Sequence, residues 1–452
     1  MSYYTDGGIR MAHKELRVSS SGRYLEYNDG RPFFYLGDTA WELFHRSSRE
    51  DVDRYLTNRA TKGFTVIQAV VVAEKGGLRD PNPYGHLPFT EGDPTRPNEN
   101  YFKHVDYVVD KAGELGLYIG MLPTWGSYWS QGSEAVFTRE NAYAYGLFLG
   151  KRYRDRPIIW ILGGDRAVQN GEEREIIESM VQGLSDGDGR THLKTFHPKG
   201  FESSSKPFPN ADWVDFHMSQ SAHLRRDYDN SLFIESDYAR VPVKPALDGE
   251  PRYETIGVAF WEKGANDYDR FDDFDVRQAA YWPLLAGACG HTYGNNAVWQ
   301  MWTPEYPIEE MIAPKVPWYE AIDHPGALQM KFVRRLFESR PFNKLIPDHS
   351  LVANGPSSEK ERIRAARASD GSFAFAYSTY GAAFTVDLTA IAAQRVKEIW
   401  YNPRYGLSFP IGTSDNGGEK TYSPPTEGRG CDWILILEDE QKAFPLPEDS
   451  GL

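Results

Sequence analysis

The sequence predicts an α/β protein, a (β/α)8 (TIM) barrel followed by a small antiparallel β-sandwich. Two patterns predict this fold class. Short apolar segments alternate with amphipathic helical segments up to about residue 340, and strand-like segments separated by turn residues follow. The 452 residues leave room for both parts. We expect an N-terminal extension at 1–13, a barrel domain at 14–341 and a β-sandwich domain at 342–452.

The apolar segments of the first part have the length and composition of buried strands. Continuous apolar runs are typical of strands that are covered on both faces, as in a parallel sheet. Eight of them suggest a closed barrel, and a doubly wound sheet is the structural alternative. The eight candidate strands are 33–37, 64–72, 117–122, 158–162, 193–196, 214–218, 245–247 and 289–293.

Helical segments lie between these strands. The segment 101–115 shows the pattern most clearly, because its apolar residues recur at helical spacing and fall on one face. A further helix at 327–339 is expected to join the two domains. The other predicted helices are 49–62, 138–152, 172–184 and 275–285.

The last quarter of the chain has the pattern of a small antiparallel domain. Turn residues such as Ser369-Asp370-Gly371 and Asn416-Gly417-Gly418 separate its apolar segments. The predicted strands are 372–377, 384–388, 397–401 and 433–437.

Composition excludes several functional classes. The 50 Lys and Arg against 64 Asp and Glu give a net charge of −14, which argues against a nucleic-acid partner. No apolar stretch is long enough to span a membrane, and the N-terminus lacks the apolar core of a signal peptide. We expect a cytoplasmic protein, with a mature secreted or periplasmic form as the alternative. Two distant cysteines exclude a disulfide framework.

Common metal and cofactor motifs are missing from the sequence. HExxH, HxH, GxSxG, the P-loop and GxGxxG do not occur. His217 and His223 with Asp215 are a weak metal-binding alternative. We therefore expect neither a metal nor a cofactor.

In a (β/α)8 barrel the catalytic residues lie at the C-terminal ends of the strands and in the loops that follow them. Asp165 follows the fourth predicted strand and Glu250 the seventh, each after a glycine. Two carboxyl groups across one barrel mouth are what glycoside hydrolysis requires. Asp165 could instead cap the next helix, and Glu250 could pair with Arg252. Rival carboxylates are Asp38, Glu74, Glu235 and Glu254.

Aromatic and polar residues collect near the same strand ends. The chain is 14% aromatic, and sugar C–H faces pack on aromatic rings while sugar hydroxyls hydrogen-bond to polar side chains. His217 could instead be a structural histidine, and Trp299 and Trp302 could belong to the core. Trp125 and Trp129 lie in a Gly/Ser/Tyr loop, where exposure at the rim is expected. The candidate substrate-binding residues are Asp38, Trp41, Gln68, Trp125, His217, Tyr253, His291 and Trp299.

Five motifs together resemble the apiosidase-like proteins of glycoside hydrolase family 140. They are GDTAWELF (37–44), WILGGD (160–165), FHMSQSAH (216–223), DGEPRYE (248–254) and GACGHTYGNNAVWQ (287–300). The similarity covers about residues 14–340, and the tail resembles the small collagen-binding-type β-domain that follows this domain in the family.

The resemblance implies a retaining glycosidase without a metal. It implies that Asp165 is the acid/base, that Glu250 is the nucleophile, and that the substrate is an apiose linkage of pectic side chains. In the larger clan the acid is usually a glutamate preceded by asparagine, whereas here an aspartate follows a glycine. The shorter side chain must be offset by the backbone.

Two alternatives stay open at this point. One is another retaining activity of the same clan, β-galactosidase-like or arabinofuranosidase-like. The other is a carbohydrate-binding protein without catalysis, because an aromatic rim with acidic residues would serve binding equally well. The expected partner in each case is a carbohydrate, with no nucleic acid and no membrane. The sequence does not fix the oligomeric state.

Overall fold

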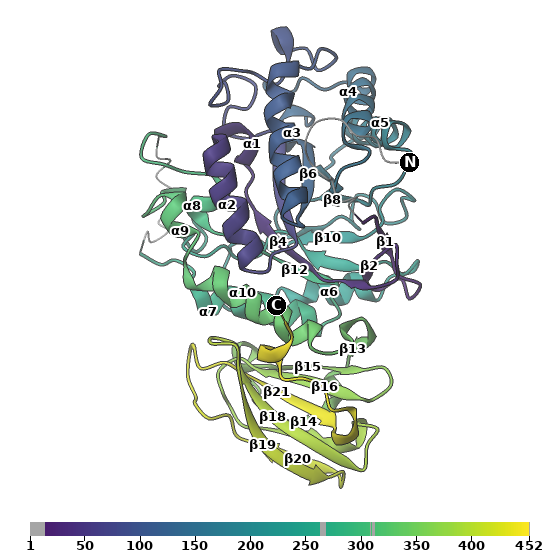
Figure 1. Cartoon of the computed structure of the whole chain (residues 1–452), viewed down its shortest axis with the longest axis vertical. Helices are drawn as coiled ribbons and strands as arrows, with labels where there is room; N and C mark the ends of the chain where they lie inside the picture. Colours follow the sequence, from purple (N-terminus) through teal and green to yellow (C-terminus); the bar gives the residue numbers. More distant parts are fainter. Residues whose placement is uncertain (1–13, 263–267, 308, 310–311, 452) are drawn as a thin grey trace.

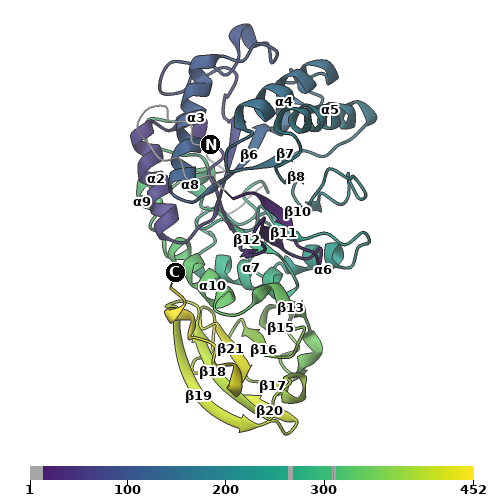
Figure 2. The same ribbon diagram turned by 45° about the vertical axis from the view of Figure 1, so that its right-hand side comes forward.

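The computed structural model describes residues 14–262, 268–307, 309 and 312–451. The extension expected at 1–13 lies outside the described residues. An α/β part and an all-β part are stacked along the long axis of the molecule, with the β part at one end (Figures 1 and 2).

A curled, all-parallel sheet of six strands forms the centre of the α/β part. The strand order is β12-β4-β5-β6-β7-β8, so the last parallel strand in the chain pairs with the first. Every residue of these strands is buried, which explains their nearly continuous apolar sequence. The strands are β4 Tyr35–Thr39, β5 Val66–Val72, β6 Tyr118–Thr124, β7 Ile158–Gly163, β8 Lys194–His197 and β12 Gly290–Tyr293.

A second, short ladder contains the other two predicted strands. β10 (His217–Gln220) and β11 (Ala246–Asp248) pair in parallel, and β9 (Glu202–Ser203) adds an antiparallel edge. Single main-chain hydrogen bonds link this ladder to both ends of the larger sheet. The Asp215 N–H donates to the Lys194 carbonyl at 2.8 Å, and the Cys289 N–H donates to the Ala246 carbonyl at 2.9 Å. All eight predicted strands are therefore present, but they fall into two ladders, and the expected closed barrel is confirmed only as a curled parallel sheet with a separate strand pair.

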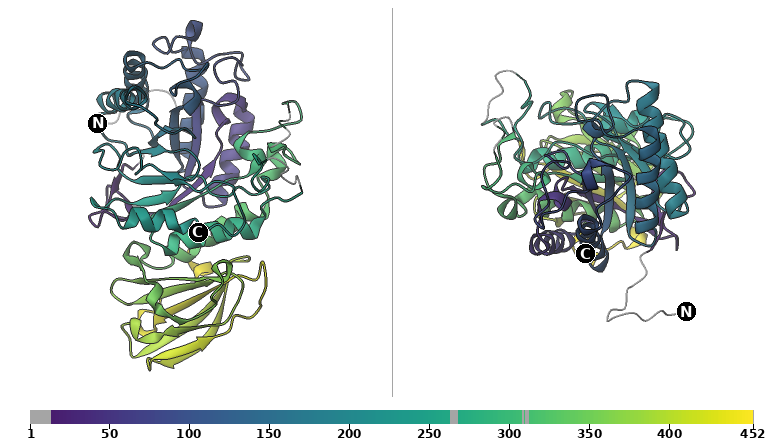
Figure 3. Two further views of the ribbon diagram at one scale, coloured as in Figure 1. Left: turned by 180° about the vertical axis from the view of Figure 1, so that it is seen from behind. Right: turned by 90° about the horizontal axis from the view of Figure 1, so that it is seen from above.

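Helices surround this sheet, as the view from above shows (Figure 3). Ser48 caps α2 in a capping box with Asp51, and Asn170 caps α5, as expected for polar residues at helix starts. The prediction missed the helix α6. The longer helices are α2 Arg49–Thr61, α3 Glu99–Glu114, α4 Arg139–Tyr153, α5 Gly171–Asp188, α6 Ser231–Tyr238, α7 Asp273–Leu285 and α10 Pro325–Glu338. The one-turn helices are α1 Leu43–Arg46, α8 Asn296–Trp299 and α9 Trp318–Ala321. No helix among the described residues is long and apolar enough to cross a membrane.

Three short strands precede the curled sheet and form a small antiparallel sheet of their own. They are β1 Leu16–Val18, β2 Leu25–Tyr27 and β3 Pro32–Phe33.

The C-terminal part consists of two antiparallel sheets, with orders β13-β15-β16-β21-β18-β19 and β14-β17-β20. Apolar residues from both sheets, among them Phe384, Trp400 and Leu435, form a shared core. Four of these strands were expected from the sequence, and the others were missed. The strands are β13 Leu345–Pro347, β14 Val352–Asn354, β15 Ile363–Ala368, β16 Phe373–Ser378, β17 Phe384–Asp387, β18 Arg395–Asn402, β19 Leu407–Asp415, β20 Glu419–Tyr422 and β21 Trp433–Asp439.

Buried ion pairs join the two parts. Arg277 of α7 forms two hydrogen bonds with Asp432, at 2.8 and 3.0 Å, and both side chains are almost fully buried. Arg340, just after α10, contacts Glu438 of β21 at 2.6 Å, again with both side chains buried. The all-β part is therefore packed firmly against the α/β part, next to α7 and α10 (Figure 1).

Candidate active site

Loops at the carboxyl ends of the parallel strands enclose one pocket of about 290 Å³. Because these ends meet at one edge of a curled parallel sheet, residues far apart in the sequence line a common wall. The lining residues are Trp41, Glu74, Lys75, Trp125, Asp165, His223, Glu250, Tyr253, Ile256, Phe260, Trp299, Glu309 and Ile312.

Asp165 stands on an unusual turn directly after β7. Gly163, Gly164 and Asp165 all have positive φ, at 98°, 106° and 51°. Glycine adopts this region freely, and aspartate tolerates it better than most residues. The turn is fixed by its neighbours, because the Gly126 N–H donates to the Gly164 carbonyl at 3.0 Å. Asp165 does not cap the next helix, since α5 begins at Gly171 with Asn170 as its cap.

The Asp165 carboxyl faces the pocket. Its Oδ1 accepts a hydrogen bond from the Gly200 N–H at 3.2 Å. The side chain keeps 37% exposure through the pocket, although protein surrounds it on its other sides. Burial raises the pKa of Asp165, and the negative charge of nearby Glu250 raises it further. This carboxyl therefore holds its proton to higher pH than an ordinary aspartate.

Glu250 has the opposite electrostatic environment. Its Oε2 lies 3.0 Å from His197 Nε2 and its Oε1 lies 3.5 Å from His223 Nε2, distances of electrostatic contact. Burial alone would raise the pKa of Glu250, but the two imidazoles outweigh it and lower the pKa to about 2. Arg252 is turned away from Glu250 and donates to Gln278 at 3.0 Å. The alternative of a Glu250–Arg252 pair is therefore wrong.

His197 connects the two carboxyl-bearing residues. Its Nδ1 accepts the backbone N–H of Asp165 at 3.4 Å, so in the neutral ring the proton sits on Nε2, which faces Glu250. The sequence analysis missed His197. The signal was available, because His197 directly follows the predicted strand 193–196, just as Asp165 and Glu250 follow other predicted strands.

Aromatic residues form much of the pocket wall. Trp41 donates its indole N–H to the Tyr253 hydroxyl at 3.2 Å, and its ring lies 5.6 Å from that of Trp125. The indole nitrogen of Trp125 is buried and has no hydrogen-bond acceptor among the described residues. A buried donor in a pocket wall is suited to a ligand oxygen. Lys75 lies 5.5 Å from the ring centroid of Trp299.

Four of the predicted binding residues, Asp38, Gln68, His217 and His291, are buried behind the pocket and are not part of its lining. Asp38 is paired with Arg59 and Tyr55, each at 2.5 Å. Gln68 donates to the Gly249 carbonyl at 3.0 Å, next to Glu250, and so supports the site indirectly. His217 lies 3.1 Å from the Ser204 hydroxyl. Burial lowers the pKa of His291 to about 3.

Of the rival carboxylates, Glu74 is the one found in the pocket lining. Burial raises its pKa to about 7, with Lys75 acting in the opposite direction. Glu235 lies instead on α6, in contact with Arg364 of the C-terminal part, and Glu254 is buried against Tyr293. Lys75, Ile256, Phe260, Glu309 and Ile312 were not predicted, because they come from irregular loops without a distinctive motif.

A family model described as "Apiosidase-like, catalytic domain" matches residues 19–344, which is more than half of the chain. The chain belongs to the apiosidase-like family. Residues 346–438 match a second model, "Putative collagen-binding domain of a collagenase". The apiosidase-like resemblance of the motifs and that of the tail are thus both confirmed.

Solved structures agree with this assignment. The apiosidase-like chain is 33% identical to a protein titled "Glycoside hydrolase", with a TM-score of 0.87 over 97% of this chain and 100% of that one. It is 32% identical to a glycoside hydrolase family 5 protein from Bacteroides vulgatus ATCC 8482, with a TM-score of 0.87 over 95% of both chains. A family 5 enzyme from Streptomyces cattleya, solved with GlcNAc, shares the fold at 14% identity and a TM-score of 0.50, covering 69% of this chain and 81% of that one. A comparison with curated proteins gave no match.

Proposed function

We propose that this protein is a retaining glycoside hydrolase in which Asp165 is the acid/base and Glu250 the nucleophile. The observation that carries the proposal is the opposite pKa shift of two carboxyl groups in one pocket, raised for Asp165 and lowered to about 2 for Glu250. Such a pair supplies a proton donor and an ionised nucleophile at the same pH.

The first step forms a covalent intermediate. The ionised carboxylate of Glu250 attacks the anomeric carbon, and the bond from that carbon to the glycosidic oxygen breaks with its electron pair on the oxygen. Asp165 gives its proton to this oxygen, so the leaving group departs as an alcohol. Protonated Asp165 and ionised Glu250 are the forms that the local electrostatics favour.

The second step releases the sugar. Asp165, now ionised, takes a proton from a water molecule, whose oxygen attacks the anomeric carbon and breaks the ester to Glu250. The sugar leaves with its original anomeric configuration, and both carboxyl groups return to their starting states. Neither step calls on a metal ion or an organic cofactor.

The proposed substrate is a plant-type oligosaccharide or glycoside with an apiose linkage, as in pectic side chains. Family membership and the aromatic, acidic pocket support this class. The indole donor of Trp125 and the ring of Trp299 are proposed to contact the sugar, together with Trp41 and Tyr253.

The decisive experiment is a panel of aryl glycosides assayed with the wild type, Glu250→Gln and Asp165→Asn. We expect one sugar to be released, a loss of about 10³-fold or more in Glu250→Gln, and a loss of about 10²- to 10⁴-fold in Asp165→Asn. NMR should detect the retained anomer first. An inverted first product, or equal behaviour of all three proteins, would overturn the proposal.

A further inference from the structure

A row of aromatic side chains leads out of the pocket and is not explained by the chemistry at the two carboxyl groups. It starts at Phe260, which lines the pocket, and continues to Trp261, whose ring centroid is 5.0 Å away. Trp261 lies 6.1 Å from Phe201, and Phe201 lies 6.0 Å from Tyr228. We call Phe260, Trp261, Phe201 and Tyr228 the aromatic track.

The far end of the track enters a second groove. This groove has a volume of about 340 Å³, and Phe201 and Tyr228 line it together with Leu232 and Phe233. Trp261 is 39% exposed and Phe201 is 37% exposed, values that are high for large apolar side chains. Phe260 and Tyr228 are half-buried. A contiguous row of exposed and half-buried rings that begins in a pocket is typical of a binding surface, whereas single exposed rings need no explanation.

The track lies on the side of the leaving group. Gly200, which precedes Phe201, donates its N–H to the Asp165 carboxyl at 3.2 Å. Asp165 gives its proton to the oxygen of the departing group in the proposed mechanism, so that group must lie next to Asp165. The backbone that holds Asp165 in place therefore also presents the first ring of the groove.

The backbone at two rings of the track, Phe201 and Phe260, is held in a conformation that few residues adopt. Phe201 has φ of 63°, and Ala259, which precedes Phe260, has φ of 47°. Hydrogen bonds stabilise each turn, from the Phe201 N–H to the Gln220 carbonyl and from the Ala259 N–H to the His223 carbonyl, both at 2.8 Å. Strained, well-bonded turns of this kind fix side chains for binding.

The volume of the pocket limits how large a part of the substrate it can hold. At about 290 Å³ the pocket is at the lower end of the size of small-molecule sites, which start at about 300 Å³, so it holds only a small part of an oligosaccharide. The groove continues the site in one direction, past Asp165.

We propose that the protein removes a single terminal sugar from an oligosaccharide, and that the aromatic track binds the departing oligosaccharide. The inference rests on the proposed hydrolase function. It adds the substrate class, a terminal sugar on a chain of further sugars, and assigns Trp261 and Phe201 as residues that contact the leaving group.

The test compares two substrates that carry the same sugar, identified from the aryl glycoside panel. One is its glycosyl fluoride, whose leaving group is a single atom and reaches no part of the track. The other is a trisaccharide with that sugar at its non-reducing end. Because aromatic contacts contribute about 0.5–1.5 kcal/mol, Trp261→Ala and Phe201→Ala should lower kcat/KM for the trisaccharide about 2- to 12-fold more than for the fluoride.

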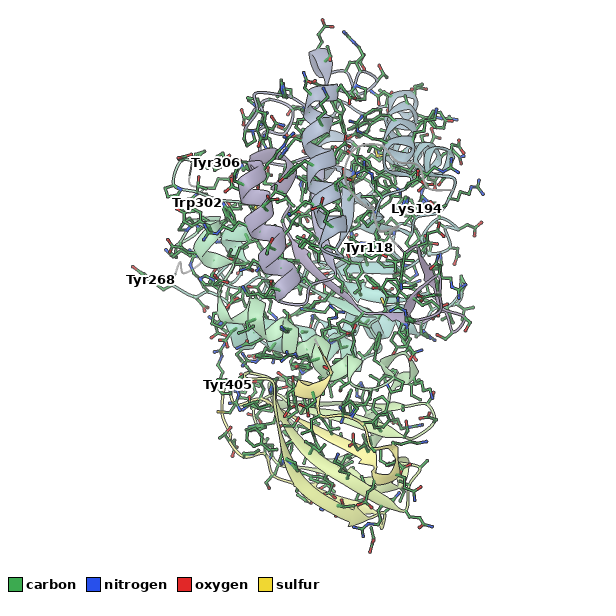
Figure 4. All side chains as sticks on the ribbon, in the orientation of Figure 1. Tyr118, Lys194, Tyr268, Trp302, Tyr306 and Tyr405 are labelled. Atoms are coloured by element: carbon green, nitrogen blue, oxygen red, sulfur yellow. The ribbon has the colours of Figure 1, made fainter. Side chains whose placement is uncertain are left out.

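Tyr405→Ala is the matched control, since Tyr405 is 68% exposed and lies in the C-terminal part (Figure 4). This variant should hydrolyse both substrates like the wild type. Thermal melting checks that each variant is folded. Titration of Glu250→Gln with the trisaccharide should change the fluorescence of the protein, and the added change Trp261→Ala should weaken this binding.

Two results separate the possible failures. Equal losses of Trp261→Ala on the fluoride and on the trisaccharide would overturn the assignment of the track while the hydrolase function stands. If the wild type hydrolyses neither the panel nor the fluoride, the hydrolase function itself fails.

Discussion

Asp165 is the residue whose identity the backbone explains most directly. A sharp turn after β7 brings three consecutive residues to positive φ, and the last of them is Asp165, at 51°. Aspartate and asparagine enter this region more readily than longer side chains. A short carboxylic side chain on a turn at the strand end can therefore line the pocket.

The two carboxyl groups predict the pH dependence of the reaction. In the proposed mechanism the nucleophile Glu250 must be ionised, so we expect activity to be lost as pH falls through its pKa, which lies at about 2. The acid must be protonated, so activity is also lost as pH rises through the raised pKa of Asp165. In the pH profile of kcat/KM, the acidic limb should lie below the pH range of ordinary assays. Asp165→Asn should remove the alkaline limb of the same profile.

Glu74 should modulate the alkaline limb. It lines the pocket, and its pKa is raised to about 7 chiefly by burial. The negative charges of Glu74 and Asp165 repel each other. Glu74→Gln removes a negative charge that helps Asp165 to keep its proton, so the alkaline limb should move to lower pH. Glu134→Gln, at an exposed pair with Arg79, is the control and should leave the profile unchanged. An unchanged limb in Glu74→Gln would contradict this coupling.

His197 should act through Glu250. Its imidazole contacts the carboxylate at 3.0 Å, whereas His223 does so at 3.5 Å. Loss of the closer contact should raise the pKa of Glu250, so His197→Gln should shift the acidic limb of kcat/KM to higher pH and lower kcat. His223→Gln should have the smaller effect. The reverse order in the two pH profiles would argue against His197 as the main support of the nucleophile.

At the scale of elements, the site depends on how closely two loop segments approach. A Cβ added to Gly126 would lie 2.2 Å from the Gly164 carbonyl oxygen, so the loop after β6 must have glycine there to meet the turn after β7. This contact sets the position of Asp165, although Gly126 is not itself part of the pocket lining.

Gly126→Ala should therefore impair catalysis more than folding. A displacement of the acid by about 1 Å can cost up to about 100-fold in rate, and we expect a loss of kcat of about 10- to 100-fold. Gly132→Ala is the control in the same loop, because a Cβ there meets nothing within 4 Å. Circular dichroism and thermal melting should show both variants folded. Wild-type kcat in Gly126→Ala would show that the turn adjusts without moving Asp165.

The sequence predicts the individual strands better than it predicts how they pair into a closed barrel. All eight parallel strands were found because buried strands are nearly continuous apolar runs, and Asp165 and Glu250 were found because they follow such runs. The pairing of the strands depends on their lengths and twist, and the short β10 and β11 form a separate ladder. Strand β19 was missed since most of its residues are exposed, and it therefore lacks an apolar pattern.

Side-chain orientation explains the remaining differences at the site. His217 and His291 lie in strands as predicted, and Asp38 lies in β4 although it was expected just after that strand. The side chains of all three are buried behind the pocket lining. Period-two alternation decides which face of a strand a residue occupies, and a fully apolar strand hides this alternation. Loop residues such as Phe260 and Ile312 reach the pocket through irregular backbone that no local pattern predicts.

At the scale of the whole molecule, the C-terminal part supports the α/β part. The pairs Arg277–Asp432 and Arg340–Glu438 are buried between them, and the rings of Tyr281 and Tyr377 lie 4.9 Å apart across the same interface. Helix α7, which carries Arg277 and Tyr281, leads directly into the segment before β12. The two parts should therefore unfold together.

Arg277→Ala should test this coupling. It leaves Asp432 buried without its main partner, and breaking a buried ion pair lowers the free energy of unfolding by about 3–5 kcal/mol. Urea unfolding followed by fluorescence and by circular dichroism should give one shared transition at lower urea concentration. Arg395→Ala, at an exposed pair in the C-terminal part, should change the midpoint little. Two separate transitions in the wild type would mean that the parts unfold independently.

The opposite protonation of Asp165 and Glu250 also suits the pocket to covalent labelling. An epoxide analogue of the terminal sugar would receive the proton of Asp165 on its ring oxygen while the Glu250 carboxylate attacks the adjacent carbon. In a carbocyclic epoxide the carbon bonded to Glu250 has no neighbouring ring oxygen to stabilise positive charge, so hydrolysis of the ester is slow and the label stays on the protein. A tagged epoxide of this kind would report the active protein in a cell extract, and its reaction with the chain would depend on both carboxyl groups.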